Sequence, residues 1–434
     1  MVVETDQGQP DQGHAVVSDR GTKRRTFAAV SLGHVLEWYD WGIYAAFVAF
    51  FAAQFFDPAD EVSAILSSLA VFAVGFLARP LGGLIFGRLS DRKGRRTTIV
   101  VTISLTSLGS LAVGVAPTYA AIGAWASLWL VTARVLQGMA AGGEQPSAQT
   151  YIAEAAPSGR RGLWSSAIYI AGTLGNSLAV AFALTLSLLL TDDQMRAWGW
   201  RVPFIVGGVL GVVVLYLRTR TAETAVFVAH ARTERPRLWP EMVRHRKQAL
   251  QVIGATTGFA VVYYAWVVAT PSYAAAVLKV PQTQALLAGL CASIVFMALM
   301  PLWGALSDRV GRKPVLLFGG LTTAALLFPL QQLANGSAWR LFLAMSIALV
   351  FLGAAVSVLP ASFAELFPTS VRTIGLAVPY AIAAALFGGT APYVRVWFAT
   401  AGLAWGFSAY VVALVLISVV TIWTLPETRG KQLD

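Results

Sequence analysis

The stretch Gly33–Tyr44, GHVLEWYDWGIY, places two carboxylic acids and a histidine inside a long apolar run. Glu37 and Asp40 are three residues apart and His34 precedes Glu37 by three, so the three side chains share one face of a helix. Neighbouring carboxyl groups in a poorly hydrated place hold protons more readily than carboxyl groups in water. We therefore predict that Asp40, assisted by Glu37, binds and releases protons. His34 either extends a proton relay or is satisfied by ordinary hydrogen bonds.

Two arginines lie in other apolar runs. Arg79 ends the segment GFLAR, and Arg134 is followed on the same helix face by Gln137. A guanidinium stays charged in a low dielectric and binds a carboxylate through two parallel hydrogen bonds. Arg79, Arg134 and Gln137, together with Tyr44, are therefore candidates for binding an anionic substrate. The alternative is that the arginines form permanent ion pairs with Glu37, Asp40 or Glu144 that only fix the packing of helices.

The elements that carry these residues are long apolar segments. The 434-residue chain is 57% hydrophobic and 12% charged, whereas soluble proteins are about 25% charged. A helix needs roughly 20 apolar residues to cross a bilayer. Twelve segments come near that length: 28–55, 64–86, 98–117, 121–146, 163–190, 202–217, 249–271, 284–306, 314–333, 340–362, 373–397 and 402–424. The predicted fold is an all-α integral membrane protein with 12 transmembrane helices. A charge at mid-bilayer costs about 3 kcal/mol on insertion scales, so we expect Glu37 and Asp40 to face an aqueous cavity.

The net charge of +11 is unevenly distributed. Lys and Arg concentrate at the N-terminus and in alternate connections, and the opposite connections carry only Arg196, Arg201, Lys279 and Arg340. This asymmetry predicts that both termini are cytoplasmic. It also explains the positive net charge, so that no nucleic acid partner is needed to account for it. Arg201 is then a structural residue at the outer boundary. Arg395, near the outer end of the eleventh segment, is expected to extend its guanidinium to the membrane surface.

Two loop motifs recur in the two halves of the chain. GRLSDRKGRR at Gly87–Arg96 returns 217 residues later as GALSDRVGRK at Gly304–Lys313, and EAAPSGRR at Glu154–Arg161 returns as ELFPTSVR at Glu365–Arg372. The order of both pairs predicts two six-helix pseudo-repeats. The expected units are a cytoplasmic tail (1–26), a first bundle (27–217), a cytoplasmic linker (218–248), a second bundle (249–424) and a second tail (425–434).

The charged residues of these loops are candidates for gating. An Asp at a helix end can pair with Arg and with the positive end of a neighbouring helix, which would latch one conformation. The alternative is a plain turn with solvated charges. The candidate gating residues are Asp91, Arg95, Glu144, Glu154, Arg161, Asp308, Arg312, Glu365 and Arg372.

The repeated loop motif resembles the G-x-L-x-D-R-x-G-R-R signature of the major facilitator superfamily. LEWYDWGIY, ARVLQGMAAGGE and WGWRVPF are similar to the metabolite:proton symporter family within it, and AELFPTSVRTIGLAVPYAIAAALFGGTAPYV is most similar to 2-oxoglutarate permeases. The resemblance implies two six-helix bundles that alternate about a central cavity. It also implies a proton-coupled importer of a small organic acid in a bacterial inner membrane. His34, where the family usually has Asn, and Arg395 depart from the pattern.

Other functions remain open or are disfavoured. Family members for shikimate, citrate, proline and betaine share much of the pattern. A drug:proton antiporter is disfavoured because the fifth segment, AIYIAGTLGNSLAV, lacks the proline of the exporter motif. A non-transporting sensor is disfavoured by the short linker and tail, and an enzyme by the lack of a cofactor loop or metal cluster. The single cysteine, Cys291, excludes an intrachain disulfide. We expect a monomer in the lipid bilayer, without cofactor or metal, whose other partners are its substrate and protons.

Overall fold

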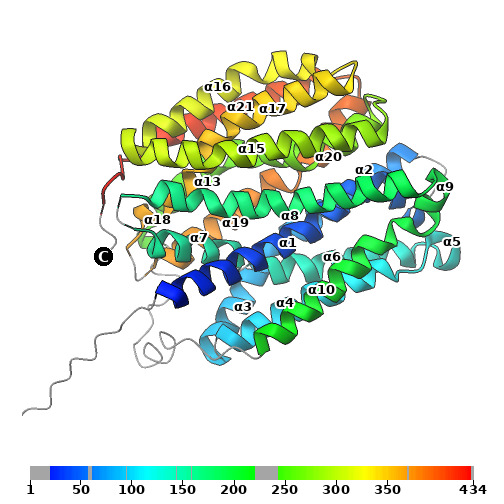
Figure 1. Ribbon diagram of the computed structural model, residues 1–434, viewed down its shortest axis with the longest axis horizontal. Coiled ribbons are helices and arrows are strands. Elements are labelled where there is room, and N and C mark those ends of the chain that lie inside the picture. The colour runs from blue at the N-terminus through cyan, green and yellow to red at the C-terminus, as the bar shows by residue number, and fades with distance from the viewer. Residues whose placement is uncertain are drawn as a thin grey trace, which may run out of the picture.

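The computed structural model describes residues 20–56, 61–93, 95–142, 144–157, 159–219, 243–368 and 371–431. Within these ranges every regular element is a helix, and most helices run along the long axis of the molecule (Figure 1). The helices before the linker are α1 (Arg20–Phe55), α2 (Glu61–Leu77), α3 (Arg79–Lys93), α4 (Arg95–Gly114), α5 (Tyr119–Ile122), α6 (Trp125–Ala141), α7 (Glu144–Ala155), α8 (Arg161–Leu189), α9 (Asp192–Gln194), η1 (Met195–Gly199) and α10 (Arg201–Thr219).

The helices after the linker follow a similar order. They are α13 (Arg246–Tyr263), η2 (Tyr264–Val268), α14 (Thr270–Ala276), α15 (Gln282–Val310), α16 (Arg312–Leu333), α17 (Ala338–Val356), α18 (Leu359–Leu366), α19 (Arg372–Ala383), η3 (Ala384–Gly388), α20 (Ala391–Thr400) and α21 (Ala404–Trp423). The elements η1, η2 and η3 are single turns of π-helix. Such turns are frequent at functional sites.

Each of the twelve predicted spans coincides with a helix or with consecutive helices, which confirms the all-α membrane fold. Among the described residues, eight helices are long and apolar enough to cross a membrane, and nine if the bent pair Asp192–Gly199 and Arg201–Tyr216 counts as one span. The other three predicted spans fall on α1, on α4 and on the interrupted pair α6 and α7. Some of these helices are short, and others carry the polar residues described in the sequence analysis. A test for long, apolar helices therefore does not identify them as membrane spans.

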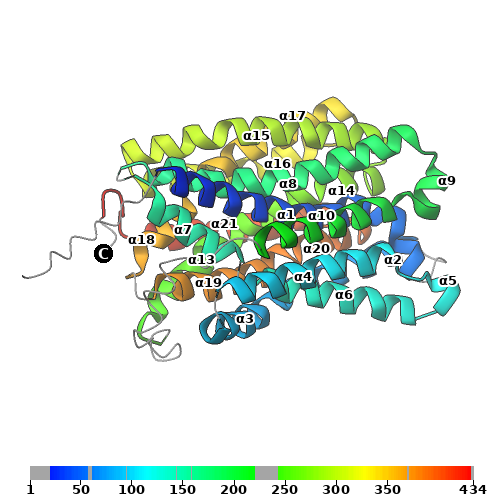
Figure 2. The same ribbon diagram turned by 60° about the horizontal axis from the view of Figure 1, so that its bottom comes forward.

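The two groups of helices lie on opposite sides of the molecule. In Figure 1, α15, α16, α17 and α21 lie above α8, and α1, α4, α6 and α10 lie below it. Helix α8 lies between α1 and α15 in Figure 1 and again in the rotated view of Figure 2, and it packs along both of them. The seam between the halves therefore follows α8, and the buried acids of α1 lie close to it.

Glycines permit close contact between helices in the first half. A Cβ added to Gly138 of α6 would lie 1.8 Å from the carbonyl oxygen of Gly75 in α2. Small residues of this kind let helix backbones approach closely in lipid, where apolar burial alone does not hold helices together. This contact helps to hold α6, and with it Arg134, against α2.

We expect Gly138→Ala to lower the thermal stability of the purified protein. A methyl group forced into a filled contact costs about 1–3 kcal/mol. The measurement is thermal unfolding in detergent. Gly83→Ala is the matched control, because its nearest atom, the Gly142 carbonyl oxygen, would be 3.3 Å from the new Cβ. Equal unfolding temperatures for both variants would contradict the proposed role of the Gly75–Gly138 contact.

Candidate functional site

Asp40 is the centre of a group of side chains from α1, α4 and α6, called here the Asp40 cluster (Asp40, Ser110, Arg134 and Gln137), in which both carboxylate oxygens have hydrogen-bond donors, while Nε and Nη2 of Arg134 have no partner among the described residues. Its Oδ1 accepts a hydrogen bond from Ser110 Oγ at 2.6 Å. Its Oδ2 accepts from Gln137 Nε2 at 2.8 Å and from Arg134 Nη1 at 3.3 Å. Arg134 Nη1 also donates to Gln137 Oε1 at 2.9 Å. All four side chains are buried, so the cluster joins three helices inside the first half.

Aromatic rings complete the surroundings of Arg134. Its guanidinium carbon lies 4.2 Å from the centre of the Trp41 ring and 4.4 Å from that of Tyr44. A desolvated cation gains up to about 2 kcal/mol from such contacts. The Tyr44 hydroxyl donates to the carbonyl oxygen of Ser68 at 2.8 Å. Of the predicted substrate-binding residues, Arg134, Gln137 and Tyr44 thus already have partners within the first half.

A second group, called here the Glu37 cluster (His34, Glu37 and Arg79), is paired much more loosely. Arg79 Nη2 lies 3.7 Å from Glu37 Oε1, and His34 Nδ1 lies 3.7 Å from Glu37 Oε2. Both Glu37 oxygens, His34 Nδ1, and Nε and Nη2 of Arg79 are buried and have no hydrogen-bond partner within the described part of the chain. The prediction of a satisfied histidine is therefore wrong for Nδ1. Buried polar groups without partners are rare in folded proteins and mark places where a ligand or water binds.

The two clusters are buried rather than hydrated. Glu37 is 5% exposed, Asp40 4% and Arg79 3%. The expectation that Glu37 and Asp40 face an aqueous cavity is therefore wrong for this conformation, in which helices of both halves cover them. The ion pairs considered as the alternative, Glu37 with Arg79 and Asp40 with Arg134, are both present.

Aromatic residues of the second half cover the Glu37 cluster. The ring of Trp38 stacks on Tyr264 with centres 5.7 Å apart and meets Tyr263 edge-on at 5.2 Å. Phe76 meets Tyr264 edge-on at 5.0 Å, and the guanidinium carbon of Arg79 lies 3.9 Å from the centre of the Phe76 ring. The unsatisfied groups thus lie where α1 and α3 meet η2.

The end of the molecule that carries Arg161, Asp308 and Arg372, called here the basic end, is closed by contacts between the halves. Asp308 accepts hydrogen bonds from the backbone nitrogens of Gly162 at 2.9 Å and Leu163 at 3.0 Å, at the start of α8. It also pairs with Arg312 at 2.6 Å. A carboxylate at a helix N-terminus meets both unsatisfied N–H groups and the positive end of the helix dipole. The contacts expected of a latch are therefore present at Asp308.

Further pairs join the halves at the basic end. Arg372 Nη1 donates to Glu154 Oε1 at 2.7 Å, and Arg161 lies 3.5 Å from Glu365. Arg161 Nη1 also donates to the carbonyl oxygen of Lys431, so the end of the chain takes part in the closure. The side chains of the remaining gating candidates, Asp91, Arg95 and Glu144, lie outside the described residues.

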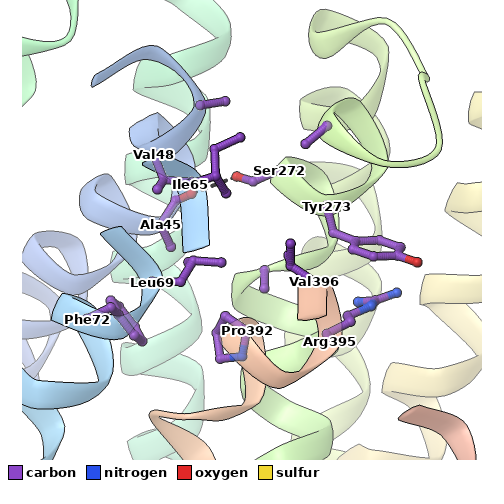
Figure 3. Close-up of a pocket in the computed structure, with 13 residues that line it drawn as sticks. Ala45, Val48, Ile65, Leu69, Phe72, Ser272, Tyr273, Pro392, Arg395 and Val396 are labelled. Carbon is purple, nitrogen blue, oxygen red and sulfur yellow. Dashed lines mark hydrogen bonds between the residues drawn. The ribbon is translucent and has the colours of Figure 1, made fainter. Parts of the chain in front are cut away.

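At the opposite end, α14 closes against α1. Ser272 Oγ donates to the carbonyl oxygen of Ala45 at 2.6 Å. Beside this contact is a small cavity of about 20 Å³, room for about one water molecule. Figure 3 shows Ala45, Val48, Ile65 and Leu69 on one side of the cavity and Pro392 and Val396 on the other.

Arg395 lies in the interior rather than at the membrane surface, so the prediction for this residue is wrong. It is 1% exposed. Its Nη1 donates to the carbonyl oxygen of Ala265 at 2.8 Å and to Thr270 Oγ1 at 2.6 Å, and its guanidinium lies 4.0 Å from the centre of the Tyr273 ring (Figure 3). The reason is that α20 packs beside η2 and α21, which cover the side chain before it can reach the surface. Arg201, in contrast, donates to Gly114 and Ala116 carbonyls as a structural residue should.

Three participants carry no signal in the sequence alone. Ser110 binds Asp40, but it is one of many hydroxyl residues in apolar segments. Tyr264 and Trp38 were indistinguishable from interface aromatics until the second half was placed against α1. To identify the polar partners of a buried charge on a neighbouring helix, one must know which helices pack together and which faces they present to each other. The sequence does not contain this information.

Comparisons with known proteins agree with this architecture. The family described as "Sugar (and other) transporter" matches residues 26–237 and 237–434. The chain is 34% identical to the alpha-ketoglutarate permease of Escherichia coli (strain K12), covering 94% of this chain and 95% of the relative. It is 35% identical to a putative proline/betaine transporter of Staphylococcus haemolyticus, covering 96% and 90%. It is 31% identical to the proline/betaine transporter of Salmonella typhimurium, covering 97% and 87%.

The same fold occurs in a solved structure. The crystal structure of a D-xylose-proton symporter superposes with a TM-score of 0.72 at 20% identity, covering 94% of this chain and 99% of the other.

We expect Arg372→Glu to open the basic end. The substitution puts a second carboxylate beside Glu154, where Arg372 Nη1 now lies 2.7 Å from Oε1, and like charges repel. The measurement is the distance between spin labels on Ala156→Cys and Leu366→Cys, in a Cys291→Ser background, by pulsed electron paramagnetic resonance. The double variant Glu154→Arg with Arg372→Glu should restore the short distance. Unchanged distances in the single variant would rule out a latch at this pair.

Proposed function

Because the chain belongs to the sugar (and other) transporter family of the major facilitator superfamily, we propose that it imports a small organic acid together with protons by alternating access. The proposed substrate is 2-oxoglutarate or a related dicarboxylate. The relative named alpha-ketoglutarate permease, 34% identical over nearly the whole chain, supports this choice. The proposed location is the inner membrane, with the basic end toward the cytoplasm in accord with the positive-inside rule.

The observation that carries the proposal is the contrast between the two buried clusters. In the Asp40 cluster both carboxylate oxygens have hydrogen-bond donors. In the Glu37 cluster neither oxygen has one. Nε and Nη2 have no partner among the described residues in Arg79 and in Arg134 alike, so the contrast lies in the two acids. A buried charge left in this state costs on the order of several kcal/mol. Such a cost is reasonable where a second anion binds during function, and Arg79 has the free N–H groups to bind it.

Competition for Arg79 would couple substrate to protons. Glu37 is the anion that now lies nearest to the Arg79 guanidinium, at 3.7 Å. If a substrate carboxylate takes that guanidinium, Glu37 loses its partner, and a buried carboxylate without a cation binds a proton rather than stay charged. Protonation of Glu37 would in turn free Arg79 for substrate. Each event favours the other, which is the thermodynamic condition for symport.

Asp40 would then have a different role from the one expected from its depth in the span. Three donors hold its two oxygens, and one of them is an arginine packed between Trp41 and Tyr44. These donors occupy three of the about four acceptor positions of the Asp40 carboxylate, so a proton finds fewer free positions on Asp40 than on Glu37, whose oxygens have no donor among the described residues. We therefore assign the transported proton to Glu37, with His34 at 3.7 Å as its neighbour in a relay, and to Asp40 the fixing of Arg134 between α1 and α6.

Both ends of the transport path are closed around the clusters. The Asp308, Glu154 and Arg372 contacts close the basic end, and the Ser272 contact with α1 closes the other. The conformation corresponds to an intermediate from which either end would open. Opening the basic end means breaking several charged contacts, whereas the opposite end has fewer of them.

The number of protons affects the driving force. A dianion that enters with one proton carries one net negative charge against an inside-negative potential, which costs about 2.3 kcal/mol per 100 mV. A second proton would remove this cost. His34 and Glu37 together offer places for two protons within one cluster.

A zwitterion such as proline or betaine is the second candidate substrate. Two of the relatives are named as proline/betaine transporters, and a site that holds both Glu37 and Arg79 can receive opposite charges. An ammonium group would also find the ring of Trp38 beside Glu37. This candidate differs from the first in its prediction for Glu37, which would bind the substrate cation instead of a proton.

We expect Glu37→Gln to abolish accumulation of radiolabelled 2-oxoglutarate driven by an inward proton gradient in proteoliposomes. Exchange of 2-oxoglutarate across the membrane without a gradient should persist within a few-fold of wild type, because Arg79 stays free to bind the anion. Asp40→Asn should reduce both activities, since Arg134 loses its partner. Arg340→Gln, an exposed charge at the start of α17, is the control and should behave like wild type.

Three results would count against the proposal. Accumulation that survives in Glu37→Gln would move the proton to another residue. Gradient-independent exchange that disappears together with accumulation would make Glu37 part of substrate binding, as the zwitterion candidate requires. If wild type takes up proline or betaine but not 2-oxoglutarate, the substrate is a zwitterion and not an organic acid.

A further inference from the structure

The second half presents an aromatic surface to the Glu37 cluster. Tyr263 and Tyr264 lie at the junction of α13 and η2, and Tyr380 lies on α19. All three are buried. The described ion pairs of the two clusters come entirely from the first half. Whatever binds at Arg79 would therefore meet hydroxyl groups and ring faces from the other side.

Tyr264 differs from the other two tyrosines in its hydroxyl group. The hydroxyl of Tyr263 lies 3.3 Å from Thr173 Oγ1, and that of Tyr380 lies 3.4 Å from the Tyr169 hydroxyl. The hydroxyl of Tyr264 is buried and has no hydrogen-bond partner among the described residues. Leaving such a group unpaired costs about 1–3 kcal/mol, so its position requires an explanation.

The ring of Tyr264 is held in place by the first half. It stacks on Trp38 at 5.7 Å and meets Phe76 edge-on at 5.0 Å. Phe76 in turn carries the Arg79 guanidinium at 3.9 Å. The Tyr264 ring and the Arg79 guanidinium thus contact the same phenylalanine at the contact between the halves.

Two side chains next to Phe76, one from each half, carry free donors. The donors are Nε and Nη2 of Arg79 and the hydroxyl of Tyr264, and each is buried without a partner among the described residues. A carboxylate offers about four acceptor positions on two oxygens. A quaternary ammonium group offers none. The donor set therefore favours an anion rich in oxygen over the cationic end of betaine.

We propose that Tyr264 is a substrate-binding residue whose hydroxyl donates to the same carboxylate that Arg79 binds, so that the substrate links the two halves. The assignment rests on the proposed function, because it takes the ligand to be an organic acid. It adds a residue from the second half to a site whose charges all come from the first. A ligand held from both sides stabilises the closed conformation in which Arg79 and Tyr264 lie together.

The test is the hydroxyl deletion Tyr264→Phe, which keeps the ring and its stacking on Trp38. We expect the KM for 2-oxoglutarate uptake in proteoliposomes to rise about tenfold or more, the effect of losing one hydrogen bond to a charged group. The rise should be the same for glutarate, which has both carboxylates but no keto oxygen. Tyr39→Phe is the matched control: Tyr39 is also buried, but its hydroxyl already donates to the Pro203 carbonyl oxygen within the first half.

The outcomes separate this assignment from the proposed function. If wild type transports no organic acid, and no organic acid raises its unfolding temperature, the proposed function and the assignment of Tyr264 are both wrong. If wild type transports 2-oxoglutarate and Tyr264→Phe has an unchanged KM, the assignment of Tyr264 is wrong and the proposed function is unaffected. A loss seen with 2-oxoglutarate and absent with glutarate would mean that the hydroxyl binds the keto oxygen, which overturns the shared carboxylate. Thermal unfolding of Tyr264→Phe without ligand, compared with Tyr39→Phe, shows whether folding is intact.

Discussion

The cost of burying charge between membrane helices determines how this molecule is arranged. Glu37, Asp40, Arg79 and Arg134 are all at most 5% exposed, and each would be expensive alone in an apolar medium. The helices that carry them, α1, α3 and α6, must therefore pack so that each acid meets an arginine. Glycines at the α2–α6 contact permit the required approach, and the aromatic rings beside both guanidinium groups replace part of the lost hydration.

The same cost explains why the two acids, three residues apart on one helix, differ so much. Asp40 meets donors from α4 and α6, both in its own half, and these donors keep their places as long as the half moves as a unit. Glu37 lies nearer the seam, where the facing residues belong to the other half. Groups that must separate when the halves move cannot supply permanent hydrogen bonds. Under the proposed function, the unsatisfied state of Glu37 would follow from its position at a contact that moves, and that position would also suit it to a transported ligand and proton.

The sequence predicted the helices well and their mutual contacts poorly. Apolar runs located all twelve predicted spans, although α1, α4 and the pair α6 and α7 are not selected by length and apolarity alone. The two acids and two deep arginines were also found, since charge in an apolar run stands out. Which acid meets which arginine depends on how α1, α3 and α6 are rotated and tilted, and the spacing within one helix does not contain this information. Arg395 shows the limit most clearly: its position near a helix end predicted the surface, but the neighbouring helices cover it and η2 supplies its acceptor. Ser110 and Tyr264 are single hydroxyl residues whose roles exist only once two other helices are in place.

The division of chemistry between the halves has a consequence for how substrate and conformation are linked. The first half holds the charged clusters as one packed unit, and the second half contributes neutral hydroxyl groups and rings. Beyond the first turn of α8, hydrogen bonds of 3.3–3.4 Å between neutral groups join the halves. Neutral hydrogen bonds of this length can be exchanged for water at small net cost. Under the proposed function, the charged contacts at the basic end would decide which conformation is held, and a ligand that adds bonds across the seam would shift that balance by the free energy of those bonds.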